Sequence, residues 1–304
     1  MCPKHARYLI KTHTNTSLSF AYMFQNKTTR NILLISVGIV GIVFLLIPSS
    51  PKEDPLDVPL PSSDTVVNVT VDSLKAFAPV ATIDTFREVA YVTYTLAPQQ
   101  TDLRIFNPDS GSRKHTFASI QSLAKEQNKE LQFIVNGGMF RQDRGPQGLL
   151  IIDAEVLHPL DTATQGYGNF YMQPNGVFGL DSGGKAYVTT TQRYENLAKQ
   201  KAFTYATQSG PMMVVDGKIN TQFNDGSPNK HIRNAVGITA DGRVVFGISK
   251  IPITFFDLSS LMIQKGCVNV LYLDGFVSKM YLPELKEGDI ESGNGLGPLI
   301  AIFE

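Results

Sequence analysis

The segment that most constrains the fold is Val268–Met280, which has the sequence VNVLYLDGFVSKM. Its first six residues form an almost continuous apolar run with one Asn, which is typical of a strand buried on both faces. The run ends at Asp274-Gly275. A carboxylate there is expected at the mouth of a pocket, because a charge placed deeper would lose hydration without compensation. A hairpin turn is the alternative for any Asp-Gly pair, although the residues after Gly275 do not alternate as a partner strand would.

The size and charge of the chain narrow the class of protein. With 304 residues, of which 42% are hydrophobic, it can build one large domain or two small ones. The first 30 residues carry five basic side chains and no acidic one. The remainder holds 22 of the 27 basic residues and all 27 acidic residues, a net charge of −5. This balance argues against nucleic acid as the main partner.

An uncharged segment, 31–47, follows the basic leader and would extend about 25 Å as a helix, close to the minimum for crossing a bilayer. Lys27 and Arg30 precede it, so the positive-inside rule places the N-terminus in the cytoplasm. A cleaved signal peptide is the alternative, but the leader is long for one and no small-residue cleavage site follows.

Four regions are therefore expected: a cytoplasmic tail (1–30), a transmembrane signal anchor (31–47), a proline-rich linker (48–64) and a folded domain (65–304). The expected location is a single-pass membrane protein with its domain outside the cytoplasm, in a bacterial periplasm.

The folded part is predicted to be an α+β domain, a strand-rich mixed sheet with a few helices. Helical spacing of apolar residues predicts helices over 116–128, with Thr116 as N-cap, and over 255–265, where Thr254 and Asp257 resemble a capping box. Asp216-Gly217 and Asp241-Gly242 are expected to be tight turns. The predicted strands are 89–96, 101–106, 131–135, 148–153, 166–171, 177–180, 186–190, 203–207, 212–215, 235–239, 244–248, 268–273 and 298–303.

Two glycine-bearing motifs follow predicted strands. The first is Asn136-Gly137-Gly138, where the glycines permit a sharp turn and close ligand approach, and Asn136 offers both a donor and an acceptor. The second is Ser209-Gly210-Pro211, where the serine could donate to an anionic ligand. Each motif alone is more often a structural turn than a site.

A third motif contains Arg233, whose permanently charged planar guanidinium suits bidentate binding of phosphate. The alternative is a surface arginine at a strand edge. A fourth motif, Gly166–Tyr171, has aromatic residues and glycines that could line a sugar-sized pocket or could form a packed strand.

The sequence lacks the residue patterns of zinc sites and of the common nucleotide-binding loops. The histidines that follow the predicted membrane segment are His115, His158 and His231, and they lack the spacing of a zinc site. No cofactor is therefore predicted, although aspartate ligands leave an oxygen-coordinated divalent cation open. Neither a Walker A loop nor G-x-G-x-x-G is present.

In combination, these motifs resemble the phosphodiester glycosidase family, and most closely its branch of exported bacterial proteins. The resemblance rests on the order and spacing of NGGMF (136–140), GLLIIDAEVLHP (148–159), QSGPMMVVDGKI (208–219), IRNAVGITADGRVVFGIS (232–249) and LYLDGFVSKMYLPE (271–284). This chain departs from another branch of the family at one motif. That branch has LDGGGS, whereas this chain has Phe276 and Val277 at the two later glycine positions. Their side chains are expected to narrow the space beside Asp274.

The resemblance implies hydrolysis of a sugar-1-phosphate diester in an envelope glycan or glycolipid. Asp274 would stabilise or attack the anomeric carbon, and Arg233 would neutralise the phosphate. Asn136, Ser209 and Ser278 would orient hydroxyls or phosphate oxygens, with Gly137, Gly138, Gly210 and Gly275 completing the substrate-binding set. A second carboxylate could be Asp153, Glu155 or Asp225.

Two rivals stay open: a non-catalytic glycan- or polymer-binding module of the same fold, and a phosphodiesterase that cuts P–O. Substituting Arg233 with alanine is expected to weaken phosphodiester binding with little loss of fold.

Overall fold

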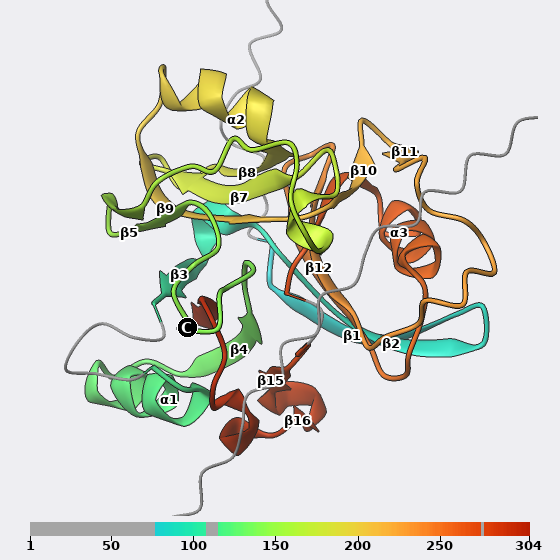
Figure 1. Ribbon diagram of the computed structural model, residues 1–304. Coiled ribbons are helices and arrows are strands. Elements are labelled where there is room, and N and C mark those ends of the chain that lie inside the picture. Colours follow the sequence, from blue (N-terminus) through green and yellow to red (C-terminus); the bar gives the residue numbers. More distant parts are fainter. Residues whose placement is uncertain (1–76, 108–114, 275–276) are drawn as a thin grey trace, which may run out of the picture. The chain divides into compact units, whose positions relative to one another are not determined.

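The computed structural model describes residues 77–107, 115–274 and 277–304 (Figure 1). They belong to one unit that spans Asn68–Glu304. The predicted cytoplasmic tail, membrane anchor and linker lie outside the described residues, as do Gly275 and Phe276. Among the described residues, no helix is long and apolar enough to span a bilayer.

The largest sheet has seven strands and contains the segment that ends at Asp274. In it, β14 lies between β12 and β10, an interior position. The strands in spatial order are β1 (Val80–Phe86), β2 (Val89–Leu96), β13 (Val244–Ser249), β12 (Asn234–Thr239), β14 (Cys267–Tyr272), β10 (Met212–Val215) and β11 (Lys218–Ile219).

Two five-stranded sheets complete the strand framework. The first consists of β16 (Glu287–Gly288), β15 (Met280–Leu282), β4 (Leu131–Asn136), β17 (Leu299–Phe303) and β3 (Asp102–Phe106). The second consists of β6 (Glu155–His158), β5 (Leu150–Ile152), β9 (Phe203–Ser209), β7 (Gly176–Asp181) and β8 (Ala186–Thr190).

The strand-rich α+β prediction is confirmed, but the expected mixed sheet is not what forms. Every pairing between the strands named above is antiparallel. The physical reason is that several neighbours are joined by tight turns, which reverse the chain. Asp216-Gly217 connects β10 to β11 in this way, and both residues have positive φ.

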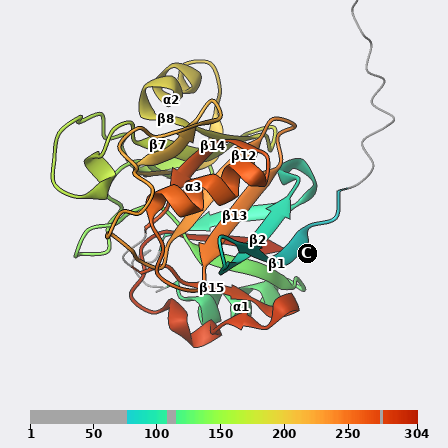
Figure 2. The same ribbon diagram turned by 90° about the vertical axis from the view of Figure 1, so that its right-hand side faces the viewer.

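Three α-helices occur in the described part of the chain: α1 (Phe117–Glu126), α2 (Thr191–Ala198) and α3 (Phe255–Gln264). The predicted caps of α1 and α3 are confirmed, because the side chains of Thr116 and Thr254 each accept a hydrogen bond from the third helical residue. Helix α3 crosses one face of the seven-stranded sheet (Figure 2). Helix α2 was not predicted, since its short sequence has few apolar residues to mark a period.

The prediction that the Val268–Leu273 run is buried on both faces is confirmed. Leu271 and Leu273 belong to a central hydrophobic cluster to which all three sheets contribute. Val270 and Tyr272 point the other way, into a second cluster beneath α3. A strand inside two cores is held rigidly, so the backbone that emerges at Asp274 has a fixed starting point.

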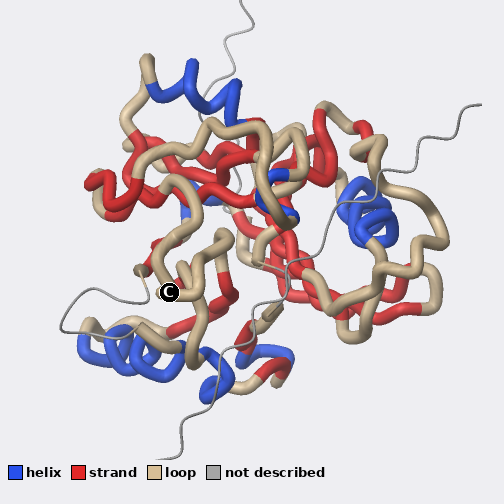
Figure 3. The backbone as a smooth tube through the Cα atoms, in the orientation of Figure 1, coloured by secondary structure: helices blue, strands red, loops and turns tan. Residues whose placement is uncertain are grey.

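The predicted strand over 166–171 is wrong. This segment is irregular and ends in a short 3₁₀ helix, Asn169–Tyr171. Figure 3 draws loops in tan and helices in blue. Gly168 has a φ of +94°, which is incompatible with a regular strand.

Candidate functional site

The backbone of Asp274 is anchored by the Asn136-Gly137 turn at the end of β4. The Asp274 N–H donates to the Gly137 carbonyl at 3.0 Å, and the Asn136 Nδ2 donates to the Asp274 carbonyl at 2.7 Å. Both contacts join residues 136–137 to a position far along the chain. The predicted NGG motif therefore lies directly against the backbone of Asp274.

A buried amide from β12 extends this anchor. Asn234 Nδ2 donates to the Asn136 carbonyl at 3.0 Å and to Asn136 Oδ1 at 3.2 Å. Asn234 Oδ1 accepts from Ser278 Oγ at 3.0 Å, and Asn136 Oδ1 also accepts from the Lys279 N–H at 2.8 Å. Because Asn136 is only 1% exposed, its polar side-chain atoms bond the protein itself, and they fix the backbone at Asp274 and at Lys279.

The third contribution comes from the end of β9. A Cβ on Gly138 would lie 2.2 Å from Thr207 Oγ1 and 2.4 Å from the Gln208 carbonyl, so only glycine allows this approach. The Pro211 carbonyl accepts from the Tyr272 N–H at 3.0 Å. Ser209 itself is fully buried, and its hydroxyl has no hydrogen-bond partner among the described residues.

Arg233 is a buried cation between two aromatic rings. The alternative interpretation, a surface arginine at a strand edge, is therefore wrong. It is 1% exposed, and its guanidinium carbon lies 3.8 Å from the Phe255 ring centroid and 5.5 Å from that of Tyr272. Its four hydrogen bonds go to neutral oxygens: the Ile253 carbonyl, the Tyr272 hydroxyl, and the carbonyl and side-chain oxygens of Asn229. None of these bonds neutralises its charge.

The pKa values of this region follow from burial. Desolvation lowers the pKa of Arg233, against the opposing effect of Tyr272. Burial raises the pKa of Tyr272 to about 12, and the negative charge of Asp274 adds to that rise. At neutral pH the tyrosine is therefore a neutral hydroxyl that accepts a hydrogen bond from Arg233 Nη1 at 3.0 Å. The charge of Asp274 acts within electrostatic range of this hydroxyl.

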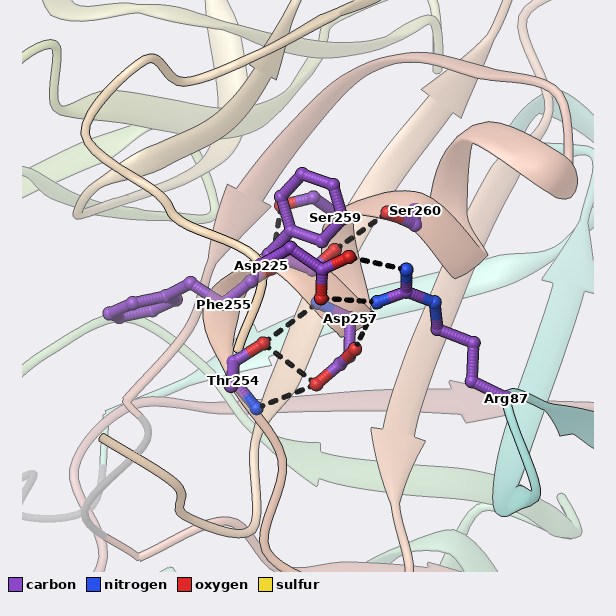
Figure 4. A network of polar contacts seen from close by, with 8 residues as sticks. Arg87, Asp225, Thr254, Phe255, Asp257, Ser259 and Ser260 are labelled. Carbon is purple, nitrogen blue, oxygen red and sulfur yellow. Dashed lines mark hydrogen bonds and ion pairs between the residues drawn. The ribbon is translucent and has the colours of Figure 1, made fainter. Parts of the chain in front are cut away.

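A loop at residues 221–231, here called the cover loop, closes over Arg233. Inside, Phe223 stacks on Phe255 with ring centroids 4.7 Å apart, and Asn229 bonds Arg233. Outside, Arg87 joins Asp225 of the loop at 2.6 Å and Asp257 of α3 at 2.9 Å (Figure 4). The loop is thus attached to the domain on both of its sides.

Most of the predicted site residues therefore meet where β4, β9, β12 and β14 end or begin. Hydrogen bonds join Asn136 and Gly137 to Asp274 and, through Asn234, join Asn136 to Ser278. Gly138 packs on Thr207 and Gln208, directly before Ser209 and Gly210. Arg233 bonds the hydroxyl of Tyr272, two residues before Asp274. Gly275 and Phe276 lie outside the described residues. Val277 packs against the hydrophobic cluster between α1 and β17.

The candidates for a second carboxylate lie apart from this cluster. Asp225 pairs with Arg87 on the outer side of the cover loop. Asp153 accepts a hydrogen bond from the Tyr205 hydroxyl at 2.6 Å and lines a different cavity of about 540 Å³. Glu155 is exposed on β6.

Three residues that the sequence did not single out complete the arrangement: Asn229, Asn234 and Tyr272. A usable signal existed for Asn234 alone, because an Asn directly before an apolar strand must bury its amide and find partners. The partners of Asn229 and Tyr272 depend on tertiary contacts. Among the described residues, no group of three or more His, Cys, Asp or Glu side chains is arranged to hold a metal ion.

Comparison with known proteins adds family information to this geometry. A phosphodiester glycosidase family model matches residues 129–295. An uncharacterised Escherichia coli (strain K12) protein, YigE, is 31% identical over 194 residues, covering 62% of this chain and 73% of that protein. A solved structure of the zebrafish N-acetylglucosamine-1-phosphodiester alpha-N-acetylglucosaminidase catalytic domain, auto-inhibited by its pro-peptide, shares the fold. Its TM-score is 0.51 at 12% identity, with 75% of this chain and 82% of that chain covered.

Proposed function

Because the chain belongs to the phosphodiester glycosidase family, we propose that it hydrolyses the bond between a sugar and a phosphodiester at the site around Asp274. The observation that carries this proposal is the buried charge of Arg233. A cation removed from water costs free energy unless an anion compensates it, and a phosphodiester supplies one negative charge.

In the proposed reaction the C–O bond at the anomeric carbon breaks and the phosphate leaves with the bonding electrons. The sugar then carries positive charge, which the Asp274 carboxylate stabilises or attacks. A phosphate is a good leaving group, and Arg233 stabilises its negative charge as it departs. Water completes the reaction by adding a hydroxyl to the sugar, while its proton passes to the released phosphate monoester or to solvent.

Access to Arg233 requires a change at the cover loop. Asn229 presents two oxygens to Nη2 of Arg233, at 2.9 and 3.1 Å, and so occupies donors that a phosphate would need. We propose that the phosphodiester replaces Asn229 as the acceptor while the loop shifts outward. The contacts to the Ile253 carbonyl and the Tyr272 hydroxyl would hold the rest of the guanidinium in place.

The substrate class is also a proposal. The name of the zebrafish enzyme specifies an N-acetylglucosamine-1-phosphodiester, which makes the methyl phosphodiester of α-N-acetylglucosamine-1-phosphate a suitable first probe. In the cell, we propose a sugar-phosphate diester of an envelope glycan or glycolipid, reached by a domain outside the cytoplasm on a membrane anchor at residues 31–47. If the anchor exists, the full chain will stay with membranes after alkaline extraction, whereas release into the supernatant would contradict it.

The test of the proposed function is turnover of this probe by the full chain and by an Asp274→Asn variant. We expect the variant to lose about 10²-fold or more in kcat/KM while keeping its fold, because the anchoring contacts of Asp274 use its backbone. Asp241→Asn, at the far end of β12, is the matched control and should retain activity. Binding of the probe without turnover, unchanged in Asp274→Asn, would favour a non-catalytic glycan-binding module instead.

A further inference from the structure

A second cavity, of about 390 Å³, lies at the start of α2 and is lined mostly by residues with uncharged polar side chains. Eight of its nine lining residues are polar: four threonines, three amides and one carboxylate. Its walls come from the segment around Pro174, the loop at 162–164 and the first turn of α2. Its volume is within the range of small-molecule sites.

The floor of this cavity is a fixed polar network. Thr191 Oγ1 donates to Asn175 Oδ1 at 2.8 Å and accepts from Gln208 Nε2 at 3.1 Å. Gln208 in turn bonds the Asp161 carbonyl at 2.7 Å. Because each of these groups already has a partner in the protein, their positions are set before any ligand enters.

One group in this floor lacks a partner. Asn175 is 3% exposed, yet its Nδ2 has no hydrogen-bond partner among the described residues. Rotating the amide would give Nδ2 the Thr191 hydroxyl as a partner and leave Oδ1 unpaired instead. In either orientation, one buried polar atom of the Asn175 side chain has no hydrogen-bond partner among the described residues. A ligand hydroxyl group could pair with it in both orientations, because a hydroxyl both donates and accepts.

Charge excludes an anionic occupant. Glu195 is the one ionisable residue in the lining, and its carboxylate would repel phosphate or another carboxylate. The N-terminus of α2 does not offset this effect, because the Thr190 side chain already caps the Arg193 N–H at 3.3 Å. A carboxylate beside hydroxyl and amide groups instead suits a ligand rich in neutral hydroxyls.

The cavity is next to the candidate site but is not part of it. A Cβ on Gly210 would lie 3.0 Å from the Asn175 Cβ, so the cavity wall packs directly on the Ser209-Gly210-Pro211 turn. The other side of that turn bonds Tyr272 through the Pro211 carbonyl. Hence one turn separates this cavity from the strand that leads to Asp274.

We propose that this cavity binds a neutral sugar residue, independently of any phosphodiester. Asn175 and Thr191 form its floor, and Gln192 and Glu195 of α2 contact the sugar hydroxyls from the open side. The inference goes beyond the proposed hydrolysis, since a glycan could be held here whether or not Asp274 catalyses its cleavage.

The experiment is saturation-transfer difference NMR of the full chain with methyl glycosides of glucose, galactose, mannose and N-acetylglucosamine. We expect at least one glycoside to bind, and a Gln192→Ala/Glu195→Ala double variant to raise its Kd about fivefold or more. Both side chains are exposed, so the variant should fold. Asn196→Ala, on the same helix but outside the lining, is the matched control and should leave the Kd unchanged.

Three results would overturn the proposal. They are the absence of binding by all four glycosides, equal effects of the double variant and the Asn196→Ala control, and competition by inorganic phosphate. Asp274→Asn separates this proposal from the hydrolytic one, because we expect it to abolish turnover without changing the Kd of the glycoside. A protein that binds the glycoside but hydrolyses no phosphodiester would therefore contradict the proposed function alone.

Discussion

At the scale of single residues, Arg233 is a charged side chain whose burial is unfavourable without an anionic partner. Its ring contacts and its hydrogen bond to Tyr272 stabilise the packing. Burying the cation costs desolvation free energy that an apolar side chain in the same place would not. The expectation that alanine would leave the fold nearly unchanged does not fit this environment, because truncation would open a cavity beside Phe255.

Methionine gives a sharper test, since it fills the space of the aliphatic stem. In Arg233→Met the Ile253 carbonyl keeps its bond from the His231 N–H, and Asn229 is exposed to water, so chiefly the Tyr272 hydroxyl loses a partner. We expect the unfolding free energy to fall by no more than about 2 kcal/mol. Affinity for inorganic phosphate, measured by calorimetry, should fall at least about tenfold.

The control for this substitution is Arg243→Met, which removes an exposed arginine that pairs with Asp241. It should change neither the unfolding free energy nor the affinity for inorganic phosphate. If Arg233→Met keeps the affinity of the unsubstituted chain for phosphate, Arg233 has no part in anion binding.

Asn136 and Ser278 belong to one network but should differ in their energetic contribution. Asn136→Asp replaces the donor to the Asp274 carbonyl with an oxygen and buries a charge, so we expect a loss of about 3 kcal/mol or more in the unfolding free energy. Ser278→Ala removes one hydroxyl donor to Asn234 and should cost about 1 kcal/mol. Denaturant unfolding measures both values. Equal losses would show that Asn136 is not the central member of the network.

The sequence singled out residues such as Asn136 and Ser278 that share one hydrogen-bond network, but it did not predict their partners. An Asn in an NGG turn has the donors and acceptors of a substrate-binding group, and nothing in the sequence shows that Asn234 and the Lys279 N–H occupy its oxygen. Hydrogen-bond partners 98 or more positions apart in the chain are set by the arrangement of the sheets. Residue type alone cannot supply them.

At the scale of elements, the cover loop depends on one arginine in the turn between β1 and β2. Arg87 has a φ of +49° and reaches both Asp225 and Asp257. Its hydrogen bonds lower the pKa of Asp225 below the ordinary value of 3.8. Burial would raise the pKa of Asp257, but hydrogen bonds from Thr254 and Arg87 outweigh it and lower that pKa as well. Both aspartates are therefore ionised and paired with Arg87 at neutral pH.

We predict that Arg87→Ala will speed amide hydrogen exchange in the cover loop at neutral pH. The pH dependence follows from the lowered pKa values of Asp225 and Asp257. Their ion pairs with Arg87 are fully present above pH 3.8 and are lost as the pH falls through the lower pKa values of the folded state. The difference between Arg87→Ala and the unsubstituted chain should therefore disappear in acid. Arg243→Ala, which breaks an exposed pair on another turn, is the control. A cover loop that exchanges at the same rate with and without Arg87 would show that Phe223 and Asn229 alone hold it.

At the scale of the whole molecule, the strongly patterned elements could be predicted and their assembly could not. The N-cap of α1, the capping box of α3 and the doubly buried β14 are local or periodic signals, and all three predictions were confirmed. Helix α2, the antiparallel pairing and the loop at 166–171 were missed because they depend on turns and tertiary packing. The convergence of Asn136, Arg233 and Asp274 could be expected only through the family resemblance, since no local pattern brings three separate strand ends together.

We propose that the molecule breaks a carbon–oxygen bond of a sugar phosphodiester at Asp274. Its most direct test is hydrolysis of the methyl phosphodiester of α-N-acetylglucosamine-1-phosphate by the full chain in ¹⁸O water, followed by mass spectrometry of both products. If the C–O bond is cleaved, we expect ¹⁸O in the anomeric hydroxyl of the released sugar and none in the phosphate. We also expect the reaction to be lost in Asp274→Asn. Appearance of ¹⁸O in the phosphate, or undiminished turnover in Asp274→Asn, would contradict it.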